Sequence, residues 1–581
     1  MALIDKASLL MVPSTYEAGK LYNVLPSGNR APDSTDQNSG YDQTRADFDF
    51  DRGSNAAASR INSSGLIEKY RENLLVQSNQ FDTTWLIGGG GTGLTLTGGQ
   101  ADKDGGNTAW LIDEVTNDQA IYQVVSTSGV QTFSIYAKAG TNDWMRLGLG
   151  GGTFSHAYFD LVNGALGNTL NIIDSSIEDA GNGWWRCSVT ANKSINAVYV
   201  YPSEANDSAG ANGSIFIQSA QLESGLVATD YLESTSVTGK AGVLVDLPRI
   251  NFDANGENGS LLLEPQRANL IQYSEYFGDS SWIKSSSVVV TSNASTSPEG
   301  VENASLVSFP SSTNRSLVYV VSGISSNTDY TFSLYIKKVS GSPSDTDLKM
   351  TIYGDVVSSV TNNIGSNISG EWQRFDVTAT TNGSASSLNL QLRSEVLQSM
   401  YIFGAQFEAG SYPSSYIPTM GTAETRAADS CSVTGVSDVI GQTEGTLFAQ
   451  VSEFPKENNG RVFAISDGTA DTYITIIKNG ANTNFAVYVD VSGVAQVSYT
   501  GSGTLANNSK IAVGYKNNDY AIYVNGTQVH TDASASVPAC DEVHVGQREN
   551  GSVTFIAGGS LKQTALFNER LTNAELAALT A

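Results

Sequence analysis

Short stretches of this chain alternate hydrophobic and polar residues with a period of two. Phe133, Ile135 and Ala137 alternate with polar or amphipathic residues, and residues 332–337 repeat the pattern. Turn signals such as Asn163-Gly164 separate these stretches, while long runs of helical periodicity are missing. Such alternation is typical of half-buried antiparallel strands. The chain is therefore predicted to be all-β, with tandem jelly-roll β-sandwiches and an extended N-terminal arm.

One large unit of the sequence occurs twice in diverged form. Four landmarks recur in the same order, namely Asn73-Leu-Leu and Asn269-Leu-Ile, Trp85 and Trp282, Trp184-Trp-Arg and Trp372-Gln-Arg, and Gln221-Leu-Glu and Gln406-Phe-Glu. A repeat of this size is a whole domain rather than a solenoid unit, so each copy should fold independently. Trp85, Trp110 and Trp282 follow loop-like sequence, and we expect them to fill the cores.

The predicted organisation has five parts. Residues 1–71 form an N-terminal attachment arm, 72–235 the first sandwich, 236–267 a connector, 268–432 the second sandwich and 433–581 a third, different sandwich. The arm has too little apolar sequence to bury a core of its own. It is either a floppy terminus or a segment ordered by a partner, and the strand-like residues 48–52 and 59–68 favour order on assembly.

Composition narrows the range of functions. The net charge is −26, with only 15% charged residues and 57 glycines, which indicates an acidic, loop-rich β protein that repels nucleic acid. The three cysteines are far apart and show neither disulfide nor zinc spacing. No signal peptide and no membrane-spanning stretch is recognised, so we expect a protein made without a secretion signal and without membrane insertion.

No catalytic motif stands out in the sequence. His156, His530 and His544 are the only histidines and lack metal-ligand spacing, and the glycine run 88–93 has no phosphate-loop context. A pair of carboxylates, as in glycosidases, is the one arrangement compatible with hydrolysis that the sequence leaves open. We nevertheless predict that the protein is not an enzyme. Residues 253–257 have side-chain oxygen atoms at alternate positions, as calcium-binding loops do. We interpret them as a turn rather than a calcium loop. The metal ligands of the protein stay unknown.

Strand alternation brings together a candidate glycan-binding face in each copy. Aromatic rings suit the apolar faces of sugars, and charged side chains suit their hydroxyl groups. The candidates are Tyr136, Lys138, Trp184, Arg186 and Glu223 in the first copy, and Tyr335, Lys337, Trp372, Arg374 and Glu408 in the second. The alternative is an Arg–Glu ion pair under a covering tryptophan, which would finish an exposed face or meet another module.

Several motifs resemble known families. Residues 433–581, with Val524-Asn-Gly526 and Leu571-Thr-x-x-Glu-Leu576, resemble a concanavalin A-like, laminin-G-type sandwich. The two copies resemble carbohydrate-binding modules, and residues 408–418, 425–429 and 60–68 resemble tailed-bacteriophage fibre and appendage proteins. The first copy departs from the pattern at residues 224–231, which lack the paired prolines, so its end is expected to pack differently.

The resemblance implies a setting for the protein. It implies a virion structural protein, a tail or head fibre or another appendage, assembled in the host cytoplasm and attached to other virion proteins through residues 1–71. It further implies host adsorption by binding of host-surface polysaccharide, a trimeric homo-oligomer and a structural Ca²⁺ ion. The alternatives are a purely structural capsid or tail decoration protein and a glycan hydrolase.

Overall fold

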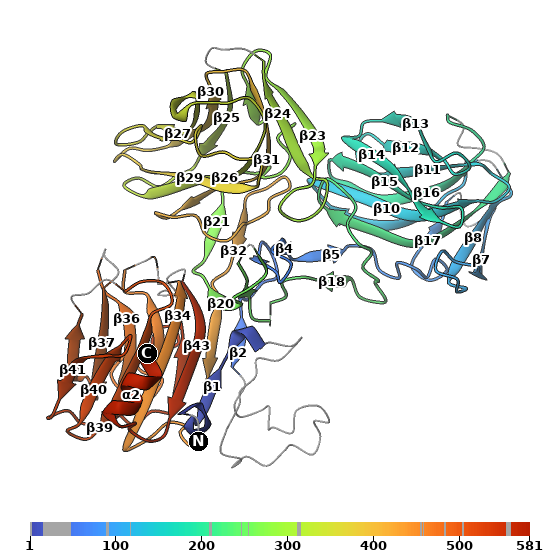
Figure 1. Ribbon diagram of the computed structural model, residues 1–581. Helices are drawn as coiled ribbons and strands as arrows, with labels where there is room; N and C mark the ends of the chain where they lie inside the picture. The colour runs from blue at the N-terminus through green and yellow to red at the C-terminus, as the bar shows by residue number, and fades with distance from the viewer. Residues whose placement is uncertain are drawn as a thin grey trace.

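The computed structural model describes residues 3–15 and 48–581, except 89–91, 117, 208–211, 246, 254, 311–314, 454–455, 457, 481–483, 502–504 and 553–558. Almost all regular structure in the described residues is antiparallel β, which confirms the all-β prediction. Three sandwiches are visible in Figure 1, two above and one below, and short two-stranded ribbons join them.

The first sandwich packs two six-stranded sheets face to face. One runs β14 (Asp174–Gly181), β15 (Trp184–Asn192), β10 (Val130–Ala139), β17 (Gly213–Ser224), β8 (Ala109–Glu114) and β7 (Leu94–Gln100). The other runs β13 (Ala165–Leu170), β12 (Ser155–Asp160), β11 (Trp144–Leu149), β16 (Ile195–Ser203), β9 (Ile121–Thr127) and β6 (Leu86–Ile87). As the alternation predicted, Phe133, Ile135 and Ala137 are fully buried between the sheets.

The second sandwich packs two five-stranded sheets in the same way. One runs β22 (Trp282–Lys284), β25 (Arg315–Ser322), β30 (Ser387–Ser394), β27 (Leu348–Gly354) and β28 (Val360–Asn363), with the short helix η3 (Asp345–Asp347) before β27. The other runs β23 (Val289–Ser295), β24 (Ala304–Phe309), β31 (Gln398–Ala409), β26 (Asp329–Ser340) and β29 (Gln373–Thr380). Trp85, Trp110 and Trp282 are buried in the two cores, as predicted.

The third sandwich is discontinuous in sequence. One sheet runs β19 (Ile250–Asn251), β20 (Ser260–Leu263), β43 (Gly559–Phe567), β34 (Glu444–Glu453), β39 (Lys510–Lys516), β40 (Tyr520–Val524) and β41 (Thr527–Asp532), with β1 (Leu9–Met11) also on β43. The other runs β2 (Asp49–Asp51), β33 (Ser430–Val433), β42 (Glu542–Val545), β35 (Arg461–Ser466), β36 (Tyr473–Lys478), β37 (Phe485–Val491) and β38 (Val494–Thr500). The short helices η1 (Leu3–Lys6) and η2 (Pro13–Thr15) flank β1, and α2 (Asn573–Thr580) ends the chain.

Segments from the predicted arm and connector therefore complete this sandwich. Leu9, Met11 and Phe48 are buried in its core beside Leu261 and Leu263. Burying these apolar side chains supplies the stabilisation that the N-terminal segment cannot generate alone. Within the segment assigned as an attachment arm, β1 and β2 therefore pair with strands of the chain's own third sandwich.

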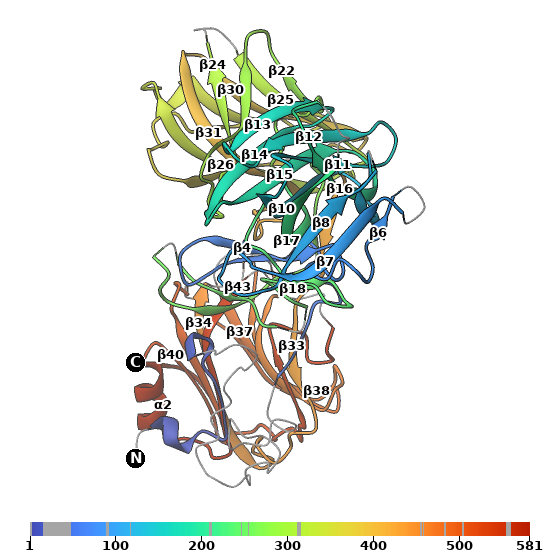
Figure 2. The ribbon, with the colours of Figure 1, turned by 90° about the vertical axis from the view of Figure 1, so that its right-hand side faces the viewer.

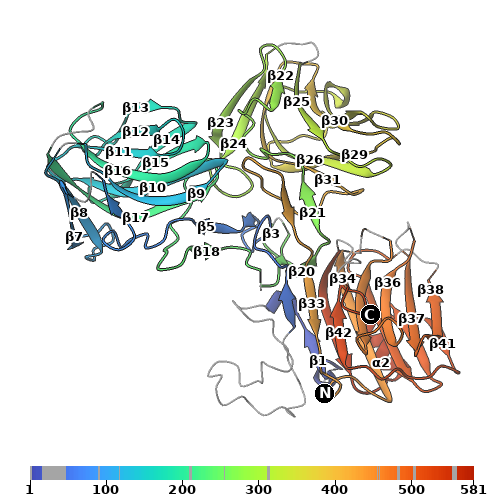
Figure 3. The same ribbon diagram turned by 180° about the vertical axis from the view of Figure 1, so that it is seen from behind.

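The duplicated sandwiches are insertions into this third one. A ribbon of β5 (Arg71–Asn73) and β18 (Gly239–Ala241) leads into and out of the first, and β21 (Arg267–Asn269) with β32 (Glu424–Arg426) does the same for the second. Figures 2 and 3 show both sandwiches standing on these ribbons above the third. A hairpin of β3 (Ser59–Ile61) and β4 (Ile67–Lys69) lies at the centre of the junction.

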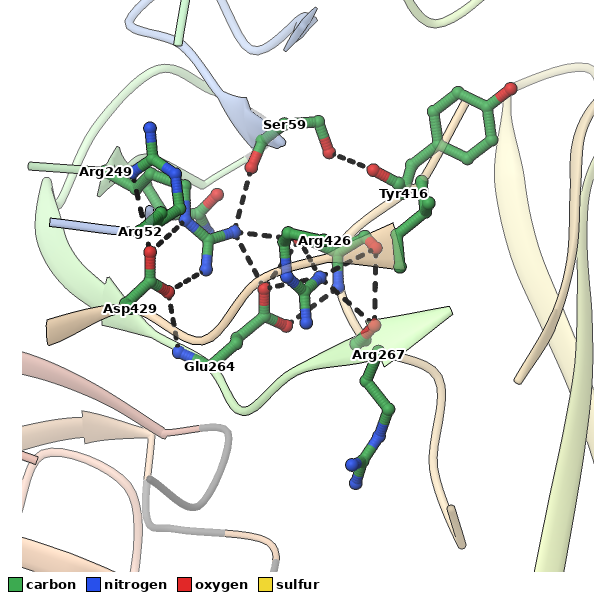
Figure 4. A network of polar contacts seen from close by, with 12 residues as sticks. Arg52, Ser59, Arg249, Glu264, Arg267, Tyr416, Arg426 and Asp429 are labelled. Atoms are coloured by element: carbon green, nitrogen blue, oxygen red, sulfur yellow. Dashed lines mark hydrogen bonds and ion pairs between the residues drawn. The ribbon is translucent and has the colours of Figure 1, made fainter. Parts of the chain in front are cut away.

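A buried ionic network, the junction cluster, holds these connections together. It consists of Arg52, Arg249, Glu264, Arg426 and Asp429 (Figure 4). Arg249 donates to Glu264 Oε2 at 2.8 Å and to Asp429 Oδ1 at 3.1 Å, and Arg426 lies 3.0 Å from Glu264. Burial alone would raise the pKa of Glu264, but the two guanidinium groups and hydrogen bonds from Ser415 hold it well below its usual range.

Candidate functional site

The candidate residues of the first copy lie on the outer face of β10 and β15 but do not form an open platform. Tyr136 pairs with Arg186 across the strands, and the guanidinium lies 5.5 Å from the ring centroid. Trp184, however, is only 1% exposed. The loop before β8 reaches this face, where Lys103 Nζ lies 4.8 Å from the Tyr136 ring centroid. The prediction that Trp184 is an exposed sugar platform is wrong.

Neighbouring polar groups on this face are also engaged within the chain. Lys138 Nζ donates to the Asn182 carbonyl at 3.0 Å, and Asn182 Nδ2 donates to the Lys103 carbonyl at 3.4 Å. The loop and the β14–β15 turn therefore bind each other over the strands.

The Gln-x-Glu landmark has a structural role in both copies. Glu223 accepts hydrogen bonds from Gln221 Nε2 at 2.6 Å and from the Thr229 backbone at 2.9 Å. Glu408 is fully buried and does the same with Gln406 at 2.5 Å and the Ser414 backbone at 2.8 Å. These carboxylates fasten the chain that returns after the last strand of each sandwich, so they are not available to a ligand.

The candidate face of the second copy is an internal interface. Tyr335 and Trp372 pack with the buried Phe403 and Tyr416 against Ile67 of the β3–β4 hairpin. Trp372 Nε1 donates to the Thr296 carbonyl at 3.1 Å. Here the alternative weighed from the sequence, contact with another module, is what the structure shows.

The charged candidates of the second copy differ in their contacts. Arg374 donates to the Ser414 carbonyl at 2.6 Å, and its guanidinium lies 5.3 Å from the Tyr335 ring centroid. Lys337 is half-buried opposite Tyr401. Sequence reasoning thus identified a real cluster of residues in this copy, but the cluster faces the junction.

The first copy keeps one contact of the second at its end, but Tyr231 is half-buried where Tyr416 is buried and also bonds Glu275. The Tyr231 hydroxyl lies 2.6 Å from Ser78 Oγ, and the Tyr416 hydroxyl lies 2.7 Å from Ser274 Oγ. The tyrosine and serine therefore keep the contact without the paired prolines.

A buried lysine attaches the hairpin to the second sandwich. Lys69 Nζ lies 3.0 Å from Glu275 and 3.0 Å from Glu299. Burial, and then the charge of Glu275, raises the pKa of Glu299 to about 7 despite the nearby ammonium group. Two carboxylates thus share one cation in a site with little water.

This arrangement predicts pH-dependent stability. Because the folded-state pKa of Glu299 is raised, its contribution to stability is complete below about pH 4.5 and is lost as the pH rises through about 7. Glu299→Gln should therefore raise the melting temperature relative to the unmodified protein more at pH 8 than at pH 5. Glu302→Gln changes an exposed carboxylate in the same loop and should show no such difference. Parallel pH profiles for all three proteins would contradict the prediction.

A cluster of aromatic side chains lies elsewhere, on the outer side of β9, β11, β12 and β16. We call it the aromatic face, formed by Tyr122, Arg146, Phe154, His156, Tyr158, Tyr199 and Tyr201. Tyr199 stacks between Tyr122 at 5.3 Å and Tyr201 at 6.1 Å, measured between ring centroids. Phe154 meets the edge of Tyr199 at 5.5 Å. The rings of Tyr122, Phe154, Tyr199 and Tyr201 are half-buried and adjoin one another, whereas Tyr158 is buried.

Strand register explains this arrangement. Gly148 of β11 pairs with His156 on one side and Tyr199 on the other. A Cβ atom at Gly148 would lie 2.3 Å from the Phe154 ring, so glycine leaves the space that this ring occupies. Two positions before Gly148, Arg146 pairs with Tyr158 and Tyr201 and so lies among the rings.

Arg146 supplies the charge of the aromatic face. Its guanidinium carbon lies 3.7 Å from the Tyr201 ring centroid, and Nη2 lies 3.3 Å from Asp118. Burial and the positive charge of Arg146 lower the pKa of His156, which favours a neutral imidazole near pH 7. The face therefore offers apolar ring surfaces, hydroxyl groups and a guanidinium group, the set of groups that sugar recognition requires.

An alternation of aromatic residues in the sequence indicates this face, although none of the landmarks shared by the two copies includes it. Phe154-Ser-His-Ala-Tyr158 and Tyr199-Val-Tyr201 alternate aromatic with small or apolar residues. The signal is absent from the second copy, where β27 and β30 carry Lys349, Thr351, Asn389 and Gln391 at outward positions. Features shared by both copies do not include a site confined to one of them.

The described residues contain no group of three His, Cys, Asp or Glu side chains arranged to bind a metal ion. Asp253 forms a turn, in which its Oδ1 accepts hydrogen bonds from the Asn255 and Glu257 backbones at 2.9 Å each. Cys187, Cys431 and Cys540 are buried, and none of these three forms a disulfide. None of the helices in the described part of the chain is long and apolar enough to cross a membrane.

Comparisons with known proteins give limited matches. No protein-family model and no curated protein matches the chain. Among solved structures, the CBM40 domain of the Ruminococcus gnavus IT-sialidase bound to alpha2,3-sialyllactose is similar at 16% identity and a TM-score of 0.23, over 25% of this chain and 86% of that chain. A mutant of NanB sialidase from Streptococcus pneumoniae gives 16% identity and a TM-score of 0.23, over 26% of each chain. A SAP-like pentraxin of Limulus polyphemus gives 13% and 0.19, over 24% of this chain and 70% of that chain.

Proposed function

We propose that this chain is a non-catalytic appendage protein of a tailed-bacteriophage virion and that it binds host-surface or environmental glycans. The observation that carries the binding part is the aromatic face, where stacked rings surround the guanidinium of Arg146. Aromatic rings stack on the apolar faces of sugars, and arginine and tyrosine hydroxyl groups hydrogen-bond their oxygens. The proposal moves the glycan site away from Trp184 and Trp372, because one is buried and the other is covered by the hairpin.

The appendage part of the proposal rests on the fibre-like motifs, and their positions in the fold support a mechanical role. Residues 425–429 supply Arg426 and Asp429 to the junction cluster, and Arg60 pairs with Glu68 at 2.7 Å across the hairpin. Motifs that hold domains together suit a protein that must display its sandwiches in a fixed arrangement. The same observation favours the alternative of a purely structural decoration protein, which needs no ligand.

Mutation of the aromatic face separates these candidates. Tyr199→Ala and Arg146→Ala should each weaken glycan binding about tenfold or more, equivalent to roughly 1.4 kcal/mol, because they remove the central ring and the central charge. The measurement is a glycan array with acidic and neutral sugars, combined with host-cell binding by the full-length protein. Tyr353→Ala is the matched control, because it removes a half-buried tyrosine from β27, the strand of the second copy that corresponds to β11.

Each outcome has a clear meaning. Binding lost in the Tyr199 and Arg146 variants, but not in the control, with unchanged melting temperatures, supports the proposal. A folded protein that binds no glycan, or equal losses in all variants, rejects glycan binding and leaves the decoration protein. Release of reducing ends from host polysaccharide would instead establish a hydrolase.

A further inference from the structure

Arg146 is the only residue of the aromatic face that is cationic near pH 7, and it has a counter-ion. Its side chain is 13% exposed, and Nη2 lies 3.3 Å from Oδ1 of Asp118, whose side chain is 68% exposed. Nη1 donates to the Tyr158 hydroxyl at 3.4 Å. Because the lowered pKa of His156 favours an uncharged imidazole, the charges of Arg146 and Asp118 leave the face without net positive charge.

The loop between β8 and β9 carries Asp118 to this position. The φ angle of Asp118 is 63°, in the left-handed region that glycine, asparagine and aspartate adopt more readily than other residues. The two ends of the loop are joined by Glu114, which is buried and accepts a hydrogen bond from the Gln119 backbone at 2.7 Å. The loop conformation thus suits an aspartate whose side chain reaches the guanidinium of Arg146.

A second carboxylate, that of Glu114, lies close enough to interact with Arg146. Burial raises the pKa of Glu114 to about 7, with a further contribution from the charge of Asp118, while the Gln119 hydrogen bond and the charge of Arg146 oppose the shift. Glu114 is therefore partly ionised near pH 7 and adds negative charge to the surroundings of the guanidinium. With a net charge of −26 on the whole chain, the field at the face does not favour an anionic ligand.

The pair of Arg146 and Asp118 suits an uncharged sugar. A guanidinium group only donates hydrogen bonds and a carboxylate only accepts them, so the pair can bind the oxygen of one sugar hydroxyl group and the O–H of another. The exposure of Asp118 leaves its carboxylate within reach of a ligand. A carboxylate or sulfate group on a sugar cannot donate to Asp118 and is repelled by it, and it would have to displace Asp118 in order to pair with Arg146.

We propose that Asp118 makes the aromatic face selective for neutral glycans over anionic ones, an inference that rests on the proposed glycan binding. Arg146 and Asp118 bind sugar hydroxyl groups together, and Asp118 excludes acidic sugars because it occupies the guanidinium and repels their charge. Removal of this one carboxylate leaves Arg146 able to pair with an acidic group of a ligand. The ligand class is thereby narrowed to polysaccharides whose sugars carry no charge.

The test uses the full-length protein on a glycan array that holds neutral oligosaccharides beside counterparts carrying a uronic acid, a sialic acid or a sulfate group. The unmodified protein should bind the neutral members about tenfold or more tightly than their anionic counterparts. Asp118→Asn, which keeps the size of the side chain and tolerates the same φ, should reduce this ratio by about tenfold or more. Asp118→Gly should act in the same direction, because glycine also adopts a positive φ.

Asp104→Asn is the matched control for this test. It removes the same charge from an aspartate that is 71% exposed and pairs with Lys103 at 2.8 Å, and Lys103 lies over Tyr136 on the other sheet of the first sandwich. This variant should keep the ratio of the unmodified protein. Melting temperatures of all variants check that each protein is folded.

Two results would overturn the inference while glycan binding itself stands. One is equal binding of neutral and anionic glycans by the unmodified protein. The other is a ratio that Asp118→Asn leaves unchanged or that Asp104→Asn changes equally, which would indicate general repulsion by an acidic protein. A folded protein that binds no glycan rejects the proposed function and this inference together, so the two failures are distinguishable.

Discussion

Replacing Asp429 with alanine is expected to lower the free energy of unfolding by about 3–5 kcal/mol, the cost of breaking a buried ion pair. Asp429 is 3% exposed and accepts hydrogen bonds from Arg249 and from the Glu264 backbone, at 3.1 and 2.8 Å, while Arg52 lies 3.5 Å away. Its loss leaves two buried guanidinium groups without this counter-ion. Equilibrium denaturation should show the change, and proteolysis should begin within residues 236–267.

A matched control uses an ion pair that is partly exposed. Arg60→Ala removes the 2.7 Å pair with Glu68, whose side chains are 21% and 30% exposed, and should cost less than about 1 kcal/mol. Similar effects for Asp429→Ala and Arg60→Ala would show that the junction cluster does not hold the domains together. A large effect confined to Asp429 would show that the inserted sandwiches depend on it for their attachment.

Replacing Asn269 with alanine is expected to destabilise the second sandwich by roughly 3 kcal/mol or more, because each backbone group left unsatisfied in the interior costs about 1–3 kcal/mol. Its Nδ2 donates to the Ala405 and Ile417 carbonyls at 3.0 and 2.9 Å, and its Oδ1 accepts from the Phe407 backbone at 3.0 Å. The substitution removes the partner of all three groups. Thermal unfolding of the purified variant measures the effect.

The duplication supplies an internal check on this prediction. Asn73 makes the corresponding bonds in the first copy, to the Ala220 and Leu232 carbonyls at 3.0 and 2.8 Å, so Asn73→Ala should destabilise that copy to a similar degree. Asn196→Ala removes an exposed asparagine from β16 and should change stability by less than about 0.5 kcal/mol. The structural role of these two asparagines would be refuted if Asn269→Ala or Asn73→Ala changed stability as little as Asn196→Ala does.

The landmarks that revealed the duplication are mostly structural. Asn73 and Asn269 join the entry strand to the last strand and to the returning chain, and Glu223 and Glu408 secure the loop after that strand. These contacts close each sandwich at the point where it connects to its ribbon. Their repetition in both copies follows from a shared topology, and it carries no information about ligands.

Local pattern alone indicated the fold class and core positions within the strands that it covered, but it did not indicate that Leu9, Met11 and Phe48 belong to the core of the third sandwich. Period-two alternation depends on neighbours along one strand, so Phe133, Ile135 and Ala137 could be assigned to the core without a tertiary model. Tyr136 with Arg186, and Tyr335 with Arg374, could be grouped from the sequence only on the condition that their strands are neighbours, and the sheet register shows that they are.

Only the tertiary structure decided which outward faces meet solvent. A residue that points away from its own core can still be covered by a segment distant in sequence, as the β3–β4 hairpin covers Trp372 and Lys103 lies over the ring of Tyr136. The discontinuous third sandwich likewise depends on pairings between β1 and β43 and between β2 and β33, across almost the whole chain. Such contacts are set by long-range packing, which leaves no periodic trace in the sequence.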